Sequence, residues 1–220
     1  MAATISANSA GGGGLVTSGD ASGVLALQTA GVTGLSIDAS QNVTFANSLT
    51  SPTLTSPVIA GTPSGVGTLT SATAVASTSG TSIDFTGIPS WAKRINVLLK
   101  GVSLSGSSGI LVQIGSGSVT TSGYLSSGTR TGATSATILS TSGVPIYLAG
   151  ASEAASAAVT INLVNTNNYI CNYSGANNAG STSIFGGGEV SLSGTLDRVR
   201  ITTVNGTDTF DAGSINIMYE

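Results

Sequence analysis

The sequence predicts an all-β protein, in which an extended N-terminal trimeric stem is followed by an antiparallel β-sandwich or jelly-roll-like C-terminal domain. Three observations predict this class. Only 7% of the 220 residues are charged, and 31 are glycine, so small uncharged residues dominate. Short runs that alternate apolar and polar residues recur between Gly, Ser and Asn turns, as half-buried strands do. No apolar run approaches the ~20 residues of a membrane-spanning helix.

The chemistry of the chain changes near residue 80. Residues 1–80 contain two charges, Asp20 and Asp38, and one aromatic residue, Phe45. All six basic residues, the single Trp and all five Tyr come later. This change is the strongest domain boundary in the sequence, and the uncharged run 70–80 is the expected connector.

Three parts follow from this division. Residues 1–14 end in four glycines, which maximise backbone freedom, and are expected to be a flexible anchor. Residues 15–80 form the β-rich stem with its connector, and residues 81–220 form the sandwich domain. The first residues lack the basic and apolar regions of a signal peptide, so export is not expected.

Within the stem, the segments 34–40 and 42–47 alternate apolar and polar residues and predict short strands. Gly31, Gly34 and the segment 40–42 are the expected turns. The tract "LTSPTLTSPVIAG" (49–61) carries prolines that favour extended or edge conformations. So few strands are not stable alone. We expect several identical chains to wrap about one axis, the alternative being a Ser/Thr/Pro linker.

The C-terminal domain is expected to hold nine strands. They lie at residues 82–87, 92–102, 109–116, 144–150, 158–165, 169–175, 188–194, 197–204 and 214–220. In the strand 197–204, Val199 and Ile201 are expected to face inward and Arg198 and Arg200 outward. Asn205-Gly206 predicts a hairpin turn. The segment 152–159 is the one possible helix.

Ten large side chains are the predicted core of this domain. They are Ile95, Val97, Leu99, Leu111, Ile161, Leu163, Val199, Ile201, Ile215 and Ile217. The lone Cys171 cannot form an intrachain disulfide, and we interpret it as a small buried hydrophobic residue.

The residue types argue against catalysis. The chain has no histidine, which removes histidine-based triads and zinc sites. No Gly-rich segment has the pattern of a phosphate-binding loop. The net charge of −3 and the scattered basic residues argue against a nucleic-acid partner. We therefore expect no enzyme, catalytic residue, cofactor or metal.

Three carboxylates lie in one expected hairpin region and are candidates for a metal-binding or catalytic site: Asp197, Asp208 and Asp211. Surface turns or ion pairs are the expected roles, a calcium site is the alternative left open, and catalysis ranks below both.

Five aromatic residues have the flat apolar face and polar tip that can stack on sugar rings: Trp91, Tyr124, Tyr147, Tyr169 and Tyr173. We expect Trp91 to be a packing plug. Tyr169 and Tyr173 share a strand face. Packing in the core or against another chain explains this arrangement at least as well as contact with a ligand. No residue is assigned to receptor binding.

Two stretches carry a resemblance. The segment 25–63, which includes "LALQTAGVTGLSIDASQNVTF", resembles the stalk-forming segments of tailed-bacteriophage fibre proteins. The segments "IDFTGIPSWAKRINVLLKGVSLSG" (83–106) and "LSGTLDRVRITTVNGTDTFDAGSINIMYE" (192–220) resemble the C-terminal domain of phage tail fibres and related virion appendages. Host-recognising fibres are often much longer than this chain.

The resemblance implies a homotrimeric structural protein on the virion exterior, made in the host cytoplasm. Its N-terminal part would dock to a tail or capsid protein, and its C-terminal domain would be exposed. The expected function is that of a tail fibre attaching to a glycan or protein of the host surface. A head fibre or capsid decoration protein is the alternative, and a polysaccharide-degrading tailspike is a third.

Overall fold

The structure is a computed structural model that describes residues 24–45, 69–132, 135–178 and 182–220. The chain divides into two compact units, residues 1–59 and 60–220. All regular secondary structure in the described ranges is β, in antiparallel sheets, which confirms the predicted class. No helix in these ranges is long and apolar enough to cross a membrane.

The first unit contains a three-stranded antiparallel sheet of β1 (Leu25–Thr29), β2 (Val32–Ile37) and β3 (Val43–Phe45). Ala30 and Gly31, both with positive φ, turn the chain between β1 and β2. Gly34 was an expected turn but lies inside β2, because the Ala30–Gly31 pair already makes the turn. The expected anchor 1–14 and the tract 49–61 lie outside the described residues.

Asp38 organises the turn between β2 and β3. Its carboxylate accepts 2.9 Å hydrogen bonds from the backbone N–H groups of Ser40 and Asn42 and from the Asn42 side chain. The Asn42 hydrogen bonds, the side-chain one first, hold the pKa of Asp38 below its ordinary value. The two alternating segments, 34–40 and 42–47, thus overlap strands that are joined by a polar turn.

One face of the three-stranded sheet has two adjacent rows that are wholly apolar. Side chains that are cross-strand partners share a face. One row across the sheet is Leu25, Ile37 and Val43, and the next is Leu27, Leu35 and Phe45. The other face presents Ala26, Ser36 and Thr44. Leu35 and Ile37 are half-buried, and the other four apolar side chains are 40–52% exposed.

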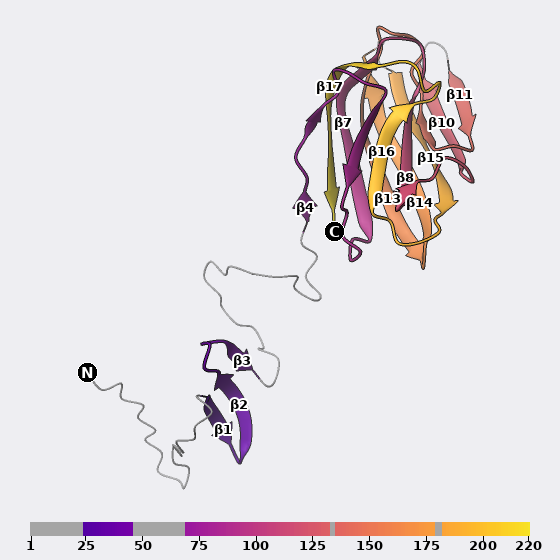
Figure 1. The fold of residues 1–220 in the computed structure, drawn as a ribbon. Coiled ribbons are helices and arrows are strands. Elements are labelled where there is room, and N and C mark those ends of the chain that lie inside the picture. The colour runs from indigo at the N-terminus through magenta and orange to yellow at the C-terminus, as the bar shows by residue number, and fades with distance from the viewer. Residues whose placement is uncertain (1–23, 46–68, 133–134, 179–181) are drawn as a thin grey trace. The chain divides into compact units, whose positions relative to one another are not determined.

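The second unit is built from two antiparallel sheets that face one another (Figure 1). The nine-stranded sheet has the order β11-β10-β15-β14-β13-β7-β17-β4, with β5 also on β17. Its strands are β4 (Thr70–Ser71), β5 (Val75–Ala76), β7 (Arg94–Leu104), β10 (Leu125–Thr131), β11 (Ala136–Ser140), β13 (Ala154–Asn165), β14 (Asn168–Asn177), β15 (Thr182–Ser191) and β17 (Phe210–Tyr219).

The five-stranded sheet has the order β12-β8-β16-β6, with β9 on β8. Its strands are β6 (Ser82–Thr86), β8 (Ile110–Ser116), β9 (Ser118–Val119), β12 (Val144–Ile146) and β16 (Arg198–Thr203). The inward side chains of both sheets form one continuous hydrophobic core. Nine of the ten predicted core residues are buried, and Leu163 is half-buried.

Each of the nine expected strands overlaps an observed one, but the possible helix at 152–159 is wrong. From Ala154 onward this segment belongs to β13, where Ala155, Ala157 and Val159 are buried in alternation. The sheet has no room for more than small side chains here, because a Cβ on Gly175 would lie 2.6 Å from the Cα of Ala157. Packing thus overrides the helix propensity of the alanines.

Two expected connections differ from the observed ones. The run 70–80 contains β4 and β5, which pair with β17, so it belongs to the sheet and not to a connector. Within it, the hydroxyl of buried Ser77 donates to Ala212 O at 2.8 Å. Asn205-Gly206 does form a turn, with φ +70° at Gly206. It joins β16 of one sheet to β17 of the other, so the predicted hairpin is wrong.

Candidate functional site

The second unit has two distinct ends. At the terminal end, Thr70 pairs with Tyr219, and the backbone N–H of Arg94 donates to Glu220 O at 2.9 Å. The start of β4 and the C-terminus therefore lie together (Figure 1). The loop end, at the other tips of the strands, is built from the turns 105–109, 147–153 and 204–209. A ligand at the loop end approaches the unit opposite the place where the chain enters it.

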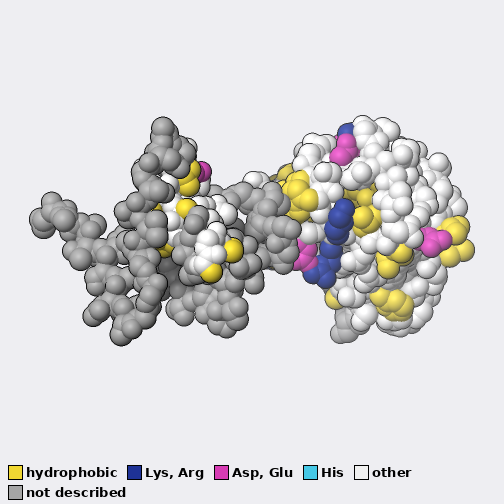
Figure 2. Space-filling model, turned by 90° about the horizontal axis from the view of Figure 1, so that it is seen from below, with side chains coloured by type: hydrophobic (Ala, Val, Ile, Leu, Met, Phe, Trp, Pro, Cys, Tyr) yellow, Lys and Arg dark blue, Asp and Glu magenta, His cyan; other side chains and the backbone are white. Residues whose placement is uncertain are grey.

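The terminal end carries paired charges. Arg94 forms an ion pair with Glu220, and Arg198 pairs with Asp197 at 2.7 Å. Figure 2 views the second unit from this end and shows basic side chains gathered beside acidic ones, with separate hydrophobic patches on a mostly uncharged surface. Because these arginines are neutralised by neighbours, the end does not present a purely basic surface.

A hollow of about 350 Å³ opens at the loop end. Its lining joins three turns to the edge strand β11 and mixes apolar, hydroxyl and amide groups. The lining residues are Ser107, Ser108, Gly109, Ile138, Tyr147, Leu148, Val204 and Asn205. One half-buried aromatic ring beside polar groups is the composition that suits a neutral, hydroxyl-rich ligand such as a sugar.

A network of charged and amide side chains holds the Tyr147 ring in place. The Arg130 guanidinium lies 5.6 Å from the ring centroid, in cation–π geometry. Its Nη1 donates to Glu153 Oε1 at 2.7 Å. Glu153 is buried, and its other oxygen accepts from Ala149 N at 2.8 Å and from Asn177 Nδ2 at 3.0 Å. This network fixes the 147–153 turn to β10 and β14.

Asn205 organises the opposite wall. Its Oδ1 accepts hydrogen bonds from the backbone of Thr207 and Asp208, at 3.1 and 3.0 Å. Ser108 ties the two turns together, because its hydroxyl accepts from Asn205 N and its N–H donates to Asp208. Hydrogen bonds from Asn205 and then Ser108 lower the pKa of the Asp208 carboxyl. The carboxylate is therefore a structural acceptor within the turn.

Three of the five aromatic candidates are unavailable to a ligand. Tyr124, Tyr169 and Tyr173 are at most 3% exposed. The Tyr169 hydroxyl accepts from Leu196 N at 3.2 Å, and the Tyr173 hydroxyl donates to Pro145 O at 2.8 Å. Burial raises the pKa of both Tyr124 and Tyr173. These tyrosines serve the core.

The remaining aromatic candidates lie at opposite ends. Trp91 packs at the terminal end against Tyr219, with ring centroids 5.7 Å apart, in keeping with the packing role expected for it. Only Tyr147 of the five combines partial exposure with a hollow of mixed polarity. Cys171 is buried as predicted, and burial raises the pKa of its thiol to about 12.

The three aspartates do not come together. Asp197 precedes β16 and Asp208 follows it, so β16 (six residues, about 20 Å) separates them. Asp211, on β17, accepts from the Ser103 hydroxyl. Arg198 holds Asp197 and lowers the pKa of its carboxyl. Within the described ranges, no group of three or more Cys, Asp and Glu side chains is placed to hold a metal ion.

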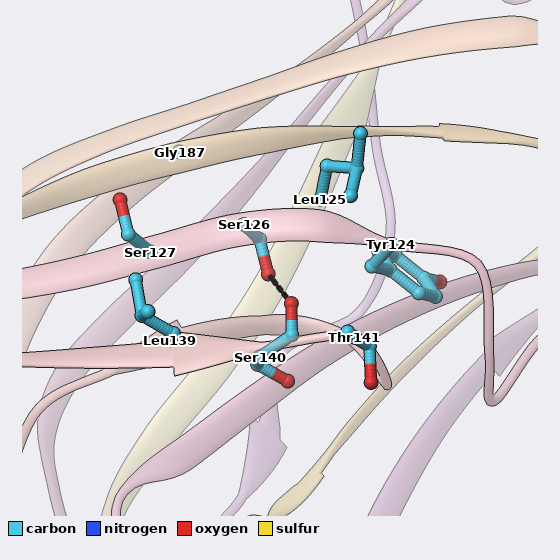
Figure 3. A pocket seen from close by; sticks show the side chains of 8 residues that line it. All are labelled: Tyr124, Leu125, Ser126, Ser127, Leu139, Ser140, Thr141 and Gly187. Atoms are coloured by element: carbon cyan, nitrogen blue, oxygen red, sulfur yellow. Dashed lines mark hydrogen bonds between the residues drawn. The ribbon is translucent and has the colours of Figure 1, made fainter.

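A second hollow, of about 540 Å³, lies between β10 and β11 (Figure 3). Its walls include Leu125 and Leu139, which are 68% and 79% exposed. Between them the Ser126 hydroxyl donates to Ser140 O at 2.8 Å and to Gly143 O at 2.6 Å. Gly187 of β15 lends no side chain to the lining, which leaves the hollow open. We call this hollow the leucine cleft.

The strands β10 and β11, which line the leucine cleft and one side of the loop-end hollow, are not evident in the sequence. The segment 124–141 is rich in Ser, Thr and Gly, so β10 and β11 were not expected. The available signal was weak: Leu125, Ser127 and Thr129 share one face, and Arg130 lies on the other. Arg130 and Glu153 are 23 residues apart, and nothing local to either residue indicates their contact.

No known protein-family model matches the chain, and no curated protein or solved structure matches it either.

Proposed function

We propose that the chain is a non-enzymatic structural fibre protein of a bacteriophage virion, which forms a homotrimer and attaches the particle to the host surface as a tail fibre. In this proposal the first unit belongs to the stem and the second unit is the exposed domain. The N-terminal segment docks to a tail or capsid protein.

The observation that carries the proposal is the apolar face of the three-stranded sheet. Six apolar side chains form this face, and four of them are 40–52% exposed in one chain. Three strands with a hydrophobic face are the least that can be stable alone, so this sheet gains stability when its exposed apolar face is covered. Three copies around an axis would bury the apolar faces against each other and leave Ser36 and Thr44 in solvent.

The loop end supports a role in attachment. It lies at the end of the second unit that is opposite the start of β4 and the C-terminus. There, Tyr147 offers an aromatic face, and Ser107 and Asn205 offer polar groups around a hollow of about 350 Å³. Neutral sugars are bound by this combination of stacking and hydrogen bonding.

Attachment can be tested with purified protein and host cells. A labelled chain should bind the cells and compete with virus adsorption. Tyr147→Ala should reduce binding, whereas Trp91→Ala, at the terminal end, is the matched aromatic control and should not. Equal binding by the Tyr147 variant would reject the loop-end site, and no binding by the folded wild-type trimer would reject the attachment role.

Microscopy of labelled particles tests the location. Label at the tail tip would support the proposal of a tail fibre. Label on the head would instead support the alternative, a head fibre or capsid decoration protein. Incubation with host polysaccharide tests the non-enzymatic part, since shortening of the polymer by the purified chain would identify a tailspike instead.

A further inference from the structure

The two sheets of the second unit present very different outer faces. On the five-stranded sheet, Arg200 forms a bidentate pair with Asp84, at 2.6 and 2.7 Å. Arg198, beside it on the same face, pairs with Asp197. Charged side chains held in surface ion pairs are ordinary for a face in water. The outer face of the five-stranded sheet is therefore a reference with which the outer face of the nine-stranded sheet can be compared.

The middle of the nine-stranded sheet's outer face has no charge across seven strands, from β11 to β17. The residue pairing defines two rows that share this face. One row is Thr137, Thr129, Phe185, Ser174, Ala158, Leu98 and Asn216. The next row is Leu139, Ser127, Gly187, Asn172, Thr160, Asn96 and Met218. Arg94 and Glu189 lie in the next row on one side, and exposed Lys100 lies in the next row on the other side.

Large apolar side chains project from this face. Leu98, Ile170 and Phe185 come from β7, β14 and β15 and are exposed, as are the two walls of the leucine cleft. The face thus has both projecting apolar groups and an open apolar hollow (Figure 3). Apolar groups gathered on one side of a sheet and rimmed by charge are typical of a protein–protein interface.

We propose that this outer face is the surface through which copies of the chain pack against each other in the second unit. The proposal rests on the homotrimer proposed above and extends it from the stem to the sandwich. Identical copies bring identical charges together, so the two uncharged rows are the part of this face that can lie near another copy without repulsion.

The uncharged rows form the centre of such a contact. Across the seven strands the two rows cover about 30 Å by 14 Å, or about 400 Å², and the flanking rows with Arg94, Glu189 and Lys100 form its rim. Stable interfaces use about 800 Å² from each partner. The exposed Ser, Thr and Asn side chains can hydrogen-bond across the contact, and the leucine cleft can receive an apolar side chain of the neighbouring copy. A heterologous contact of this kind closes into a ring.

The first test adds charge to the centre of the face. Asn172→Glu with Ser174→Glu places two carboxylates on exposed positions of β14 in the full-length protein. The matched control, Ser82→Glu with Thr86→Glu, adds the same charge to exposed positions of β6 on the other outer face. Sedimentation equilibrium measures the protein concentration below which the assembly dissociates. Relative to the wild type, this concentration should rise at least tenfold for the β14 variant and should not rise for the β6 variant.

A second test keeps the proposal falsifiable if the charged variant does not fold. Ser174→Cys and Ser82→Cys each add one accessible thiol, while buried Cys171 reacts poorly because its thiol pKa is about 12. In the assembled protein, maleimide should label Cys at position 174 at least tenfold more slowly than at position 82. Equal labelling rates in a trimer would overturn the interface yet leave the stem-driven trimer and the attachment role standing. A monomeric wild-type protein would overturn both the interface and the trimer.

Discussion

The phenol of Tyr124 fills a gap in the hydrogen-bond ladder of β8 at Ile114. Its oxygen accepts from Ile114 N at 2.8 Å and donates to Ile114 O at 3.3 Å. Along this edge β8 pairs with β12 up to Val112 and with β9 from Gly115 onward. Ile114 lies between the two short strands, where the Tyr124 hydroxyl partners its N–H and Thr120 N also donates to its carbonyl oxygen at 3.0 Å.

Tyr124→Phe should therefore destabilise the second unit by about 1–3 kcal/mol, because it leaves the buried N–H of Ile114 without a partner, while Ile114 O keeps its 3.0 Å hydrogen bond from Thr120 N. Denaturant unfolding measures this difference, with Tyr147→Phe at a half-buried position as the control. If both variants unfold at the same midpoint as the wild type, the Tyr124 hydroxyl does not contribute to stability.

A stronger prediction concerns the side chains of β16 that face the core. Ile201 is completely buried, so Ile201→Asp places an unpaired charge in the core and should prevent folding of the second unit. Ser82→Asp, on the exposed side of the neighbouring strand β6, should fold normally. Limited proteolysis distinguishes them, and a protease-resistant Ile201 variant would contradict the assigned strand facing.

How far the sequence predicted the fold depended on side-chain size. Strands with large alternating residues, such as β16 and the second half of β17, were predicted with the correct face. β10 and β11 were missed because Ser, Thr and Gly give little contrast between faces. The Asn205-Gly206 turn was located, but turn chemistry is local and does not specify which sheet the next strand joins.

The candidate site was harder to predict than the core. Tyr147 was one of five aromatic candidates of equal appearance, and only the third dimension separates it from buried Tyr124, Tyr169 and Tyr173. Tyr169 and Tyr173 are buried by alternation within β14, whereas Tyr124 lies just before β10, where no strand pattern indicates its burial. The contact between Arg130 and Glu153 joins β10 to the turn 147–153, which lies far along the chain, so no local pattern encodes it.

Asp197 should make stability depend on acid pH. The hydrogen bond from Arg198 lowers the pKa of Asp197 below its ordinary value of 3.8. As the pH falls, Asp197 therefore binds a proton at a higher pH in the unfolded chain than in the folded chain. The contribution is fully present above about pH 5 and is lost as the pH falls through the folded-state pKa.

Asp197→Asn should therefore lower the free energy of unfolding at pH 7 and have little effect near pH 2. The side chain is 39% exposed, so solvent screening keeps the difference below about 1 kcal/mol. Thermal unfolding across this pH range checks it, and 1 M salt should reduce the difference. A wild-type–variant difference that does not change with pH would contradict the assigned ion pair.

Residues 1–14 are predicted to be the part that docks into the particle. Their four glycines can adapt to a binding site that lacks the three-fold symmetry of the fibre. Deletion of these residues should leave a folded trimer in solution that is no longer incorporated into virions. Immunoblots of purified particles provide the measurement, and normal incorporation of the truncated chain would exclude the anchor role.

The apolar face of the first unit gives the most direct prediction about assembly. Leu35→Asp with Ile37→Asp puts two charges on the middle strand of that face, β2, where every cross-strand neighbour is apolar. Three chains packed around an axis would bring these carboxylates together, so mass in solution should fall from three chains to fewer. Ser36→Asp with Thr44→Asp adds the same charge to the opposite face and should leave the mass unchanged. If instead the apolar-face variant keeps the wild-type mass and dissociation concentration, that face does not hold the chains together.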